Sequence, residues 1–242
     1  MQLITLNIWG GHVLEPLLAF VKAHQDIDIF CFQEVYHHAA NRISDEDRPV
    51  CLDIFSKLEA LLPEHRGFFR SVVDTIYGIG IFIKKDIDVI EEGEIVIHHN
   101  PSYRGRGPTH SRNLQWLTYR YHDKTYSILN VHGLWNGMGK ADSPERLLQS
   151  RRIRTFMDSL QSLTILCGDF NLRPDTLSME ILEQGMNNLI KTNNITSTRT
   201  NFYTKDEKFA DYILTSPEII IDRFNVLTDV VSDHSPLLLE FS

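Results

Sequence analysis

Apolar and β-branched residues gather along the chain in strand-length runs, which are bounded by Gly, Asp, Asn or Pro. This pattern predicts β-strands. The runs cover residues 3–9, 27–32, 76–83, 89–97, 114–121, 126–131, 163–167, 211–214 and 237–241. Because the runs between Ile76 and Tyr126 follow one another directly, we expect antiparallel pairing there.

Four other segments repeat apolar residues at the i, i+3, i+4 spacing of an amphipathic helix. The stripes are Leu14-Leu17-Leu18-Val21, Leu52-Phe55-Leu58-Leu62, Ile153-Phe156-Met157-Leu160 and Leu182-Met186-Leu189. Ser143 and Pro144 suit a helix cap and the first helical position ahead of the third stripe. Strands and helices are mixed without strict alternation, and no linker divides them. The predicted fold class is therefore α+β, a single domain over residues 1–242 with two stacked, mainly antiparallel sheets and helices outside.

Composition and charge narrow the function only slightly. The chain has 242 residues, 42% of them hydrophobic, and a formal charge of −8, which does not point to a nucleic-acid binder. One locally basic segment, residues 103–112, is either a solvated loop or a phosphate-contacting rim, with Arg112 as a candidate substrate-binding residue.

The cysteines and the N-terminal residues indicate the expected cellular location of the protein. The three cysteines have no metal-type spacing, which fits a reducing cytosol. The N-terminus lacks the features of a secretory signal, and no run approaches the ~20 apolar residues that span a bilayer. We therefore expect a cytoplasmic protein without an integral membrane segment, and no obligate protein partner is evident.

Polar residues recur at the ends of the predicted strands, where a rigid scaffold can bring distant side chains together. These residues are Asn7, Glu34, His132, Asp169, Asn171, Asp211, Asp233 and His234. Asp169 and Asn171 flank Phe170 in the segment LCGDFN. In an extended chain both would point the same way, with Phe170 in the core, although a polar turn is the simpler alternative for this segment alone.

Carboxylates, amides and imidazoles in this combination suit metal-assisted phosphoester hydrolysis. Mg²⁺ prefers oxygen ligands and keeps sites for water and phosphate, with Mn²⁺ as the alternative ion. A base must align water, and neutral donors must hold the developing charge. Other chemistries fit less well, because the chain has no G-x-S-x-G segment, no P-loop and no clustered His and Cys.

The chain resembles the endonuclease/exonuclease/phosphatase superfamily, whose members share the DNase I-like fold. Six blocks carry the resemblance in the expected order: LNIWG, QEV, NVHG, GDFN, DYIL and SDHSPL. The resemblance spans residues 3–238 and implies a four-layered α/β/β/α sandwich. GDFN and SDHSPL are its specific blocks.

The resemblance also implies roles for the strand-end residues. Glu34 would be the main metal carboxylate, with Asn7 beside the metal and Asp233 supporting that side. Asp169 would orient or deprotonate the attacking water, and Asn171 would hold a phosphate oxygen or that water. His234 would hydrogen-bond the scissile phosphate, Asp211 would orient a catalytic histidine, and His132 would contact the phosphate or the leaving group.

Two further residues are candidate substrate contacts. Trp135 lies in the Gly-rich segment after His132 and could stack on a base or simply pack its loop. Arg173 follows GDFN and could contact phosphate or form a surface salt bridge.

The expected activity is that of a phosphodiesterase acting on nucleic-acid or nucleotide esters, by analogy with much of the superfamily. Hydrolysis of phospholipids or inositol phosphates, as by sphingomyelinases and 5-phosphatases, is the first alternative. A catalytically silent binding module on the same fold is the second, although the expected catalytic set is intact.

Overall fold

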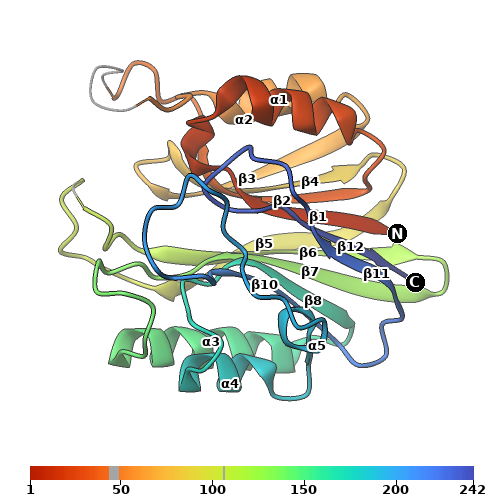
Figure 1. The fold of residues 1–242 in the computed structure, drawn as a ribbon. Coiled ribbons are helices and arrows are strands. Elements are labelled where there is room, and N and C mark those ends of the chain that lie inside the picture. The colour runs from red at the N-terminus through yellow and green to blue at the C-terminus, as the bar shows by residue number, and fades with distance from the viewer. Residues whose placement is uncertain (44–48, 106) are drawn as a thin grey trace.

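Two six-stranded sheets stack face to face in the computed structural model, which describes residues 1–43, 49–105 and 107–242 (Figure 1). The first sheet has the order β11 (Ile221–Val226), β12 (Leu237–Phe241), β1 (Gln2–Asn7), β2 (Ile29–Tyr36), β4 (Tyr77–Lys84) and β3 (His65–Val73). The second has the order β5 (Asp88–His98), β6 (Arg112–Tyr121), β7 (Lys124–His132), β8 (Leu163–Asp169), β10 (Asp211–Thr215) and β9 (Asn187–Asn188).

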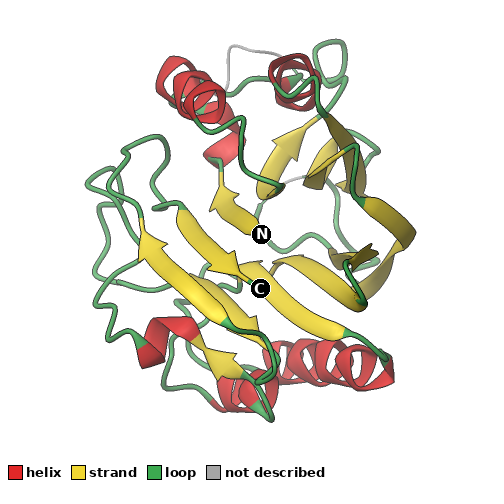
Figure 2. Ribbon diagram, turned by 90° about the vertical axis from the view of Figure 1, so that its right-hand side faces the viewer, coloured by secondary structure: helices red, strands yellow, loops and turns green. Residues whose placement is uncertain are grey.

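Helices cover the outer faces of both sheets (Figure 2). On the first sheet lie α1 (Leu14–Ala23) and α2 (Ile54–Leu61), and on the second lie α3 (Pro144–Ser159) and α4 (Leu177–Glu183). The short η1 (Trp9–Gly11) follows β1, and α5 (Leu189–Thr192) follows β9. The predicted four-layered α/β/β/α sandwich is confirmed.

Burial on both faces explains why the strands read as continuous apolar runs. In β1, Leu3 packs into the core between the sheets, whereas Ile4 packs beneath α1 and α2. Strands β2 and β4 alternate in the same way. None of the described helices is both long and apolar enough to cross a bilayer.

Most expected strands and helices form, with shifted ends. Ser143 caps α3 by accepting from the Arg146 backbone N–H, as expected. The fourth apolar stripe is not one helix, because Leu182 belongs to α4, Met186 lies in the connection after it and Leu189 begins α5. Strands β3 and β11 escaped prediction because both lie at sheet edges, where partly exposed residues hide the apolar pattern.

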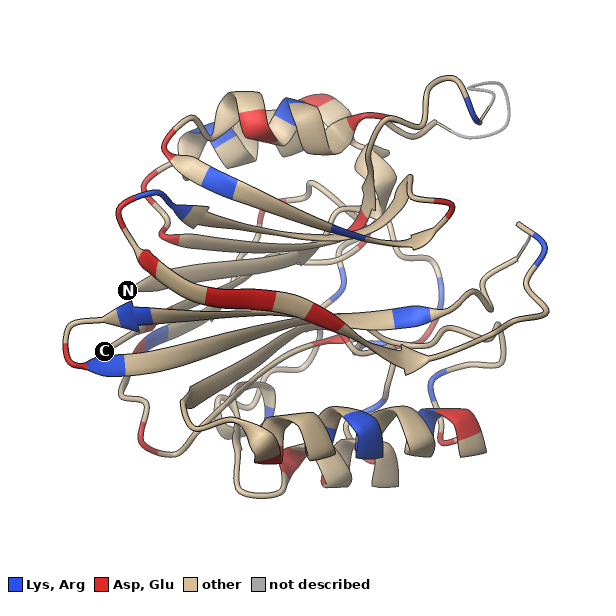
Figure 3. Ribbon diagram, turned by 180° about the vertical axis from the view of Figure 1, so that it is seen from behind, with Lys and Arg blue, Asp and Glu red and all other residues tan. Residues whose placement is uncertain are grey.

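Acidic residues mark the edge strand β5 of the second sheet (Figure 3). Glu91, Glu92 and Glu94 are there, and Glu92 forms a salt bridge with Arg70 of β3, the neighbouring edge strand of the first sheet. Charged edge strands resist pairing with other chains. The mainly antiparallel pairing is as expected, and each sheet has one parallel pair, β1–β2 and β7–β8.

Gly168, the last residue before Asp169, allows the close approach of β7 and β8. Its φ is +129°, and a Cβ there would lie 2.1 Å from the Val131 carbonyl oxygen.

We expect Gly168→Ala to lower the free energy of unfolding by about 3 kcal/mol, since backbone overlap cannot be relieved by a rotamer change. Gly137→Ala is the control, because its φ is also positive but nothing lies near its Cβ position; it should cost about 1 kcal/mol. Urea unfolding of both variants measures the difference, and equal losses would contradict the steric explanation.

Candidate active site

The strand order brings the predicted polar residues to one edge of the paired sheets. β1 and β2 are parallel, so Asn7 and Glu34 leave the first sheet at the same end. In the second sheet, Asp169 pairs in register with His132 on parallel β7 and with Asp211 on antiparallel β10. Convergence of residues far apart in sequence is thus a consequence of topology.

A cleft of about 1070 Å³ opens at this edge. The predicted residues that line it are Glu34, Arg112, His132, Trp135, Asp169, Asn171, Asp233 and His234. Asn7 and Asp211 contact this set through hydrogen bonds. Arg173 is not among the described lining residues, and its guanidinium pairs with Asp175 at 3.1 Å. Of the basic segment, Arg106 lies outside the described residues.

Glu34 is turned into the cleft by a β-bulge. Gln33 and Val35 pair with the consecutive residues Ile79 and Gly78, which leaves Glu34 as the extra residue, with φ +58°. Bulges re-aim side chains in this way. Gly78, which pairs with Val35, allows the close approach of β3 on its other side, since a Cβ there would lie 1.9 Å from the Arg70 carbonyl oxygen. Burial raises the pKa of Glu34, although the hydrogen bond from Asn7 opposes that shift.

Asn7 connects the acids of the two sheets. Its Nδ2 donates to Glu34 Oε1 at 3.0 Å and to Asp169 Oδ2 at 3.1 Å. Its Oδ1 accepts the backbone N–H of Trp9 at 2.9 Å, which fixes the orientation of the amide. Asn7 therefore holds the two carboxylates close together.

Asp169 is held as a carboxylate despite its burial. Burial disfavours the charged form, but the positive charges of His234 and Lys140 outweigh it and hold the pKa of Asp169 well below its usual range. The backbone N–H of Asn171 donates to Oδ1 at 2.9 Å, and its Nδ2 lies 3.3 Å from Oδ2. Hydrogen bonds of this kind also favour the ionised form.

The GDFN segment presents both polar side chains to the cleft by a turn rather than by strand alternation. β8 ends at Asp169, and Asn171 has φ +52°, a conformation that Asn tolerates better than most residues. The expectation of an extended chain at Asn171 was therefore wrong. Phe170 is buried between the sheets, as predicted.

His234 and Asp211 form a buried pair. Nδ1 of His234 lies 2.8 Å from Asp211 Oδ1, and Thr198 Oγ1 donates to Asp211 Oδ2 at 2.9 Å. Burial disfavours the imidazolium, but Asp211 and Asp169 more than offset this and raise the pKa of His234. Arg199 Nη1 lies 2.5 Å from His234 Nε2. The guanidinium must move away when Nε2 carries a proton, because two donors cannot share that contact.

His132 is a neutral imidazole. Burial and the charge of Arg112 hold its pKa well below the ordinary value. Its Nε2 lies 3.7 Å from Asp169 Oδ2 and 3.8 Å from Glu34 Oε1. An uncharged ring in this position can donate or accept a hydrogen bond without adding a charge to the site.

The site residues fit a divalent cation. Glu34 is a half-buried carboxylate whose Oε1 accepts from an amide, and burial raises its pKa more than that hydrogen bond and the charge of His234 lower it. Asp169, Asp211 and His234 also place ligand-type atoms within 4.8 Å of one another. Both Asp211 oxygens are already engaged by His234 and Thr198. Glu34 and Asp169 are therefore better placed to hold the ion, and their oxygen donors suit Mg²⁺ or Mn²⁺.

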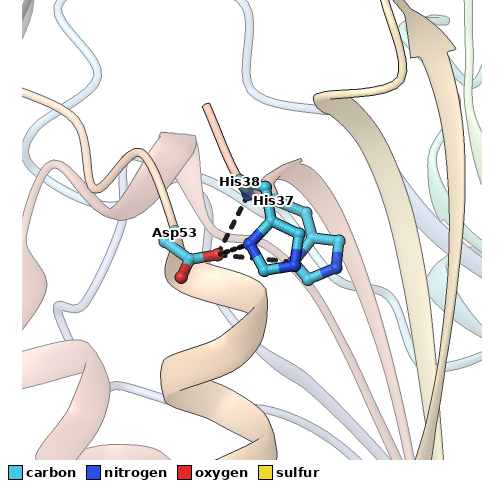
Figure 4. Close-up of side chains that lie close together, drawn as sticks. All are labelled: His37, His38 and Asp53. Atoms are coloured by element: carbon cyan, nitrogen blue, oxygen red, sulfur yellow. Dashed lines mark hydrogen bonds and ion pairs between the residues drawn. The ribbon is translucent and has the colours of Figure 1, made fainter. Parts of the chain in front are cut away.

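A second group of ligand-type side chains lies outside the cleft lining, between the end of β2 and the start of α2 (Figure 4). His37 and His38 place Nδ1 at 3.3 and 3.5 Å from Asp53 Oδ1. That oxygen already accepts the His38 N–H at 3.0 Å and the Ser56 hydroxyl at 2.8 Å. Hydrogen bonding ahead of α2 is sufficient to explain this group.

Lys140, Arg199 and Tyr203 are among the cleft residues that the sequence analysis did not single out. Lys140 follows the Gly-rich segment that drew attention to Trp135, and Arg199 and Tyr203 lie in a loop without a strand-end pattern. Arg199 reaches the site because it bridges in register with His234. Its proximity to that block depends on tertiary pairing, which leaves no local sequence signal.

The fold and site belong to a known class of phosphoesterases. The sequence model of the Endonuclease/Exonuclease/phosphatase family matches residues 4–234, so the chain belongs to this family. Members of the family are generally phosphoester hydrolases and usually use a divalent metal.

Solved structures share the fold along the whole chain. The mannosyl-6-phosphatase of Bacteroides thetaiotaomicron is 20% identical, with a TM-score of 0.76 and coverage of 100% of this chain and 99% of that one. TDP2 of D. rerio, humanized by 14 mutations, is 16% identical, with a TM-score of 0.74 and coverage of 100% and 98%. The human Nocturnin catalytic domain is 18% identical, with a TM-score of 0.68 and coverage of 100% and 94%. No curated protein matches the chain.

The raised pKa of His234 predicts that the contribution of the His234–Asp211 pair to stability depends on pH. The pair with Asp211 contributes fully below the unfolded-state histidine pKa of about 6.5, and its contribution is lost as pH rises through the higher folded-state pKa. In metal-free buffer, Asp211→Asn should therefore lower the free energy of unfolding more at pH 6 than at pH 9. Urea unfolding at both pH values measures the two losses. Losses of equal size would show that the imidazolium is not stabilised by Asp211.

Proposed function

We propose that this protein is a divalent-metal-dependent phosphoesterase that hydrolyses phosphodiesters of nucleic-acid or nucleotide type. The observation that carries the proposal is the meeting of Glu34 and Asp169, bridged by Asn7, beside His132 and His234 in one cleft. Acids and imidazoles that lie this close together can hold a cation and a phosphate together.

Glu34 would hold the metal, with Asp233 supporting that side of the cleft. A bound divalent cation would neutralise phosphate charge and favour departure of the leaving oxygen. Asn7 would fix the Glu34 carboxylate against the metal.

Asp169 is better suited to orienting water than to removing its proton completely, because its depressed pKa makes it a weak base. Asn171, whose backbone and amide both contact Asp169, would hold that water or a phosphate oxygen. His234, fixed by Asp211, would donate from Nε2 to the phosphate and stabilise its growing charge. His132 would contact the phosphate or the leaving group as a neutral donor.

The substrate preference has weaker support than the reaction. The cleft is large enough for a nucleotide, and Trp135 and Tyr203 line it as surfaces on which a base could stack. The structure of a mannosyl-6-phosphatase shares the fold, so a phosphomonoester of a sugar is the second candidate. Phospholipid or inositol-phosphate hydrolysis and a catalytically silent binding module remain alternatives. Three free cysteines support a cytoplasmic location.

Metal dependence is the first test of the reaction. Hydrolysis of bis-p-nitrophenyl phosphate should require Mg²⁺ or Mn²⁺ and stop with EDTA. Glu34→Gln should shift the Mg²⁺ titration to at least tenfold higher concentration, because a neutral amide is a weaker ligand than a carboxylate. Glu59→Gln, an exposed change on α2, is the control. An unchanged titration for Glu34→Gln would remove Glu34 from the metal site, and turnover that resists EDTA would refute metal dependence.

Asp169→Asn tests the role of the second carboxylate. We expect turnover to fall by about 10²–10⁴-fold, since the amide cannot accept from water in the same way. The matched control is Asp158→Asn, which removes an exposed carboxylate from α3. Circular dichroism and thermal unfolding would establish that both variants fold. Activity within a fewfold of the unmodified protein would exclude Asp169 from the chemistry.

A further inference from the structure

Lys140 is a buried cation without a hydrogen-bond partner in the wall of the cleft. Its side chain is 1% exposed, and its Nζ has no hydrogen-bond partner within the described part of the chain. It is also the one lysine among the described buried residues. Burying an ammonium in this way is costly, so the arrangement needs a reason beyond stability.

The backbone around Lys140 is held in place by another buried residue. Arg146 of α3 donates from Nη2 to the Gly139 carbonyl at 2.7 Å and from Nη1 to the Ala141 carbonyl at 2.5 Å. The carbonyl of Lys140 itself accepts the backbone N–H of Arg173 at 3.1 Å. The ammonium is therefore presented from a fixed backbone, as a preorganised binding group should be.

A second cation lies on the same wall. The Arg199 side chain is 6% exposed and stacks on the Tyr203 ring at 3.9 Å. Its Nη1 forms a salt bridge with Asp233 at 3.3 Å, but its buried Nε has no partner among the described residues. Arg199 and Lys140 repel each other, and Asp169 attracts both. Two buried positive groups that each keep a donor without a partner are more stable when a further anion lies beside them.

We propose that Lys140 and Arg199 form an anion subsite beside Asp169, which binds phosphoryl oxygens that carry negative charge beyond the single charge of a phosphodiester centre. The proposal rests on the proposed function, because it names the charge of the substrate at the same site. The extra charge has two sources, a dianionic phosphomonoester at the reacting centre or a second phosphate next to it. Burial lowers the pKa of Lys140 to about 8, so most of the ammonium remains protonated at pH 7.

Binding measurements test the subsite without relying on turnover. Inorganic phosphate and pyrophosphate would be titrated calorimetrically, in EDTA at pH 7, into the unmodified protein, Lys140→Met and Lys140→Gln. We expect both variants to weaken pyrophosphate binding at least tenfold with a largely unchanged Tm, because Nζ makes no hydrogen bond with the described residues. The control is Lys22→Met on α1, an exposed position that should leave binding within twofold.

The two anions separate the two sources of charge. An equal loss for phosphate and pyrophosphate would indicate a dianion on one phosphorus, whereas a loss for pyrophosphate alone would indicate a neighbouring phosphate. In turnover, Lys140→Met should reduce kcat/KM for p-nitrophenyl phosphate more than for bis-p-nitrophenyl phosphate if the first source is correct.

The subsite would be overturned if the unmodified protein bound neither anion, or if both Lys140 variants bound the anions as tightly as the unmodified protein. A marked fall in Tm with unchanged binding would show that Lys140 has a structural role instead. A different result would refute the proposed function. If the unmodified protein hydrolyses no ester with Mg²⁺ or Mn²⁺ but loses pyrophosphate binding on substitution of Lys140, the subsite stands and the phosphoesterase does not.

Discussion

One side-chain amide, that of Asn7, joins the chemistry of the two sheets. It donates to Glu34 from its own sheet and to Asp169 from the other, at 3.0 and 3.1 Å. Carboxylates that close together repel each other unless donors or a cation lie nearby. By donating to both carboxylates, the Asn7 amide reduces this repulsion. Just behind it, Gln33 donates to Asn130 at 2.7 Å across the sheet interface, which fixes how the sheets align at the cleft. The hydroxyl of Ser232 donates to the Asn7 carbonyl at 2.7 Å and ties the segment before β12 to the same point.

Aiming the site residues has a conformational cost that the surrounding fold must bear. Glu34 and Asn171 both have positive φ, which is unfavourable for residues other than glycine. Each is held by its neighbours, Glu34 by the paired strands on either side of its bulge and Asn171 by the contacts of its backbone N–H and amide with Asp169. The concentration of strain at the cleft is consistent with selection for orientation rather than for stability.

The sequence predicted the sheets, the layers and the strand-end residues that meet in the cleft, because strand ends and the six blocks carry local signals. Glu34 and Asp169 could be placed at strand ends, but the bulge at Glu34 could not, since it depends on pairing with β4 across a glycine. Arg199 and Lys140 could not be foreseen either. Arg199 reaches the cleft by pairing with His234. The backbone around Lys140 is held by the buried guanidinium of Arg146, and both arrangements depend on tertiary contacts. Edge strand β3 was missed because its burial is only partial.

The net charge of this protein is a poor guide to the ligands that it binds, because it sums the charges of the outer surface and of the cleft. The chain carries −8 overall, and acids gather on the edge strand β5 (Figure 3), none of whose residues lines the cleft. Inside the cleft, Arg112, Lys140 and Arg199 are buried, and each keeps at least one donor without a partner among the described residues. Buried donors act at low dielectric and short range, where their effect on a bound anion exceeds that of distant surface carboxylates. An acidic protein can therefore still present positive donors to a bound anion, and its net charge does not show where those donors lie.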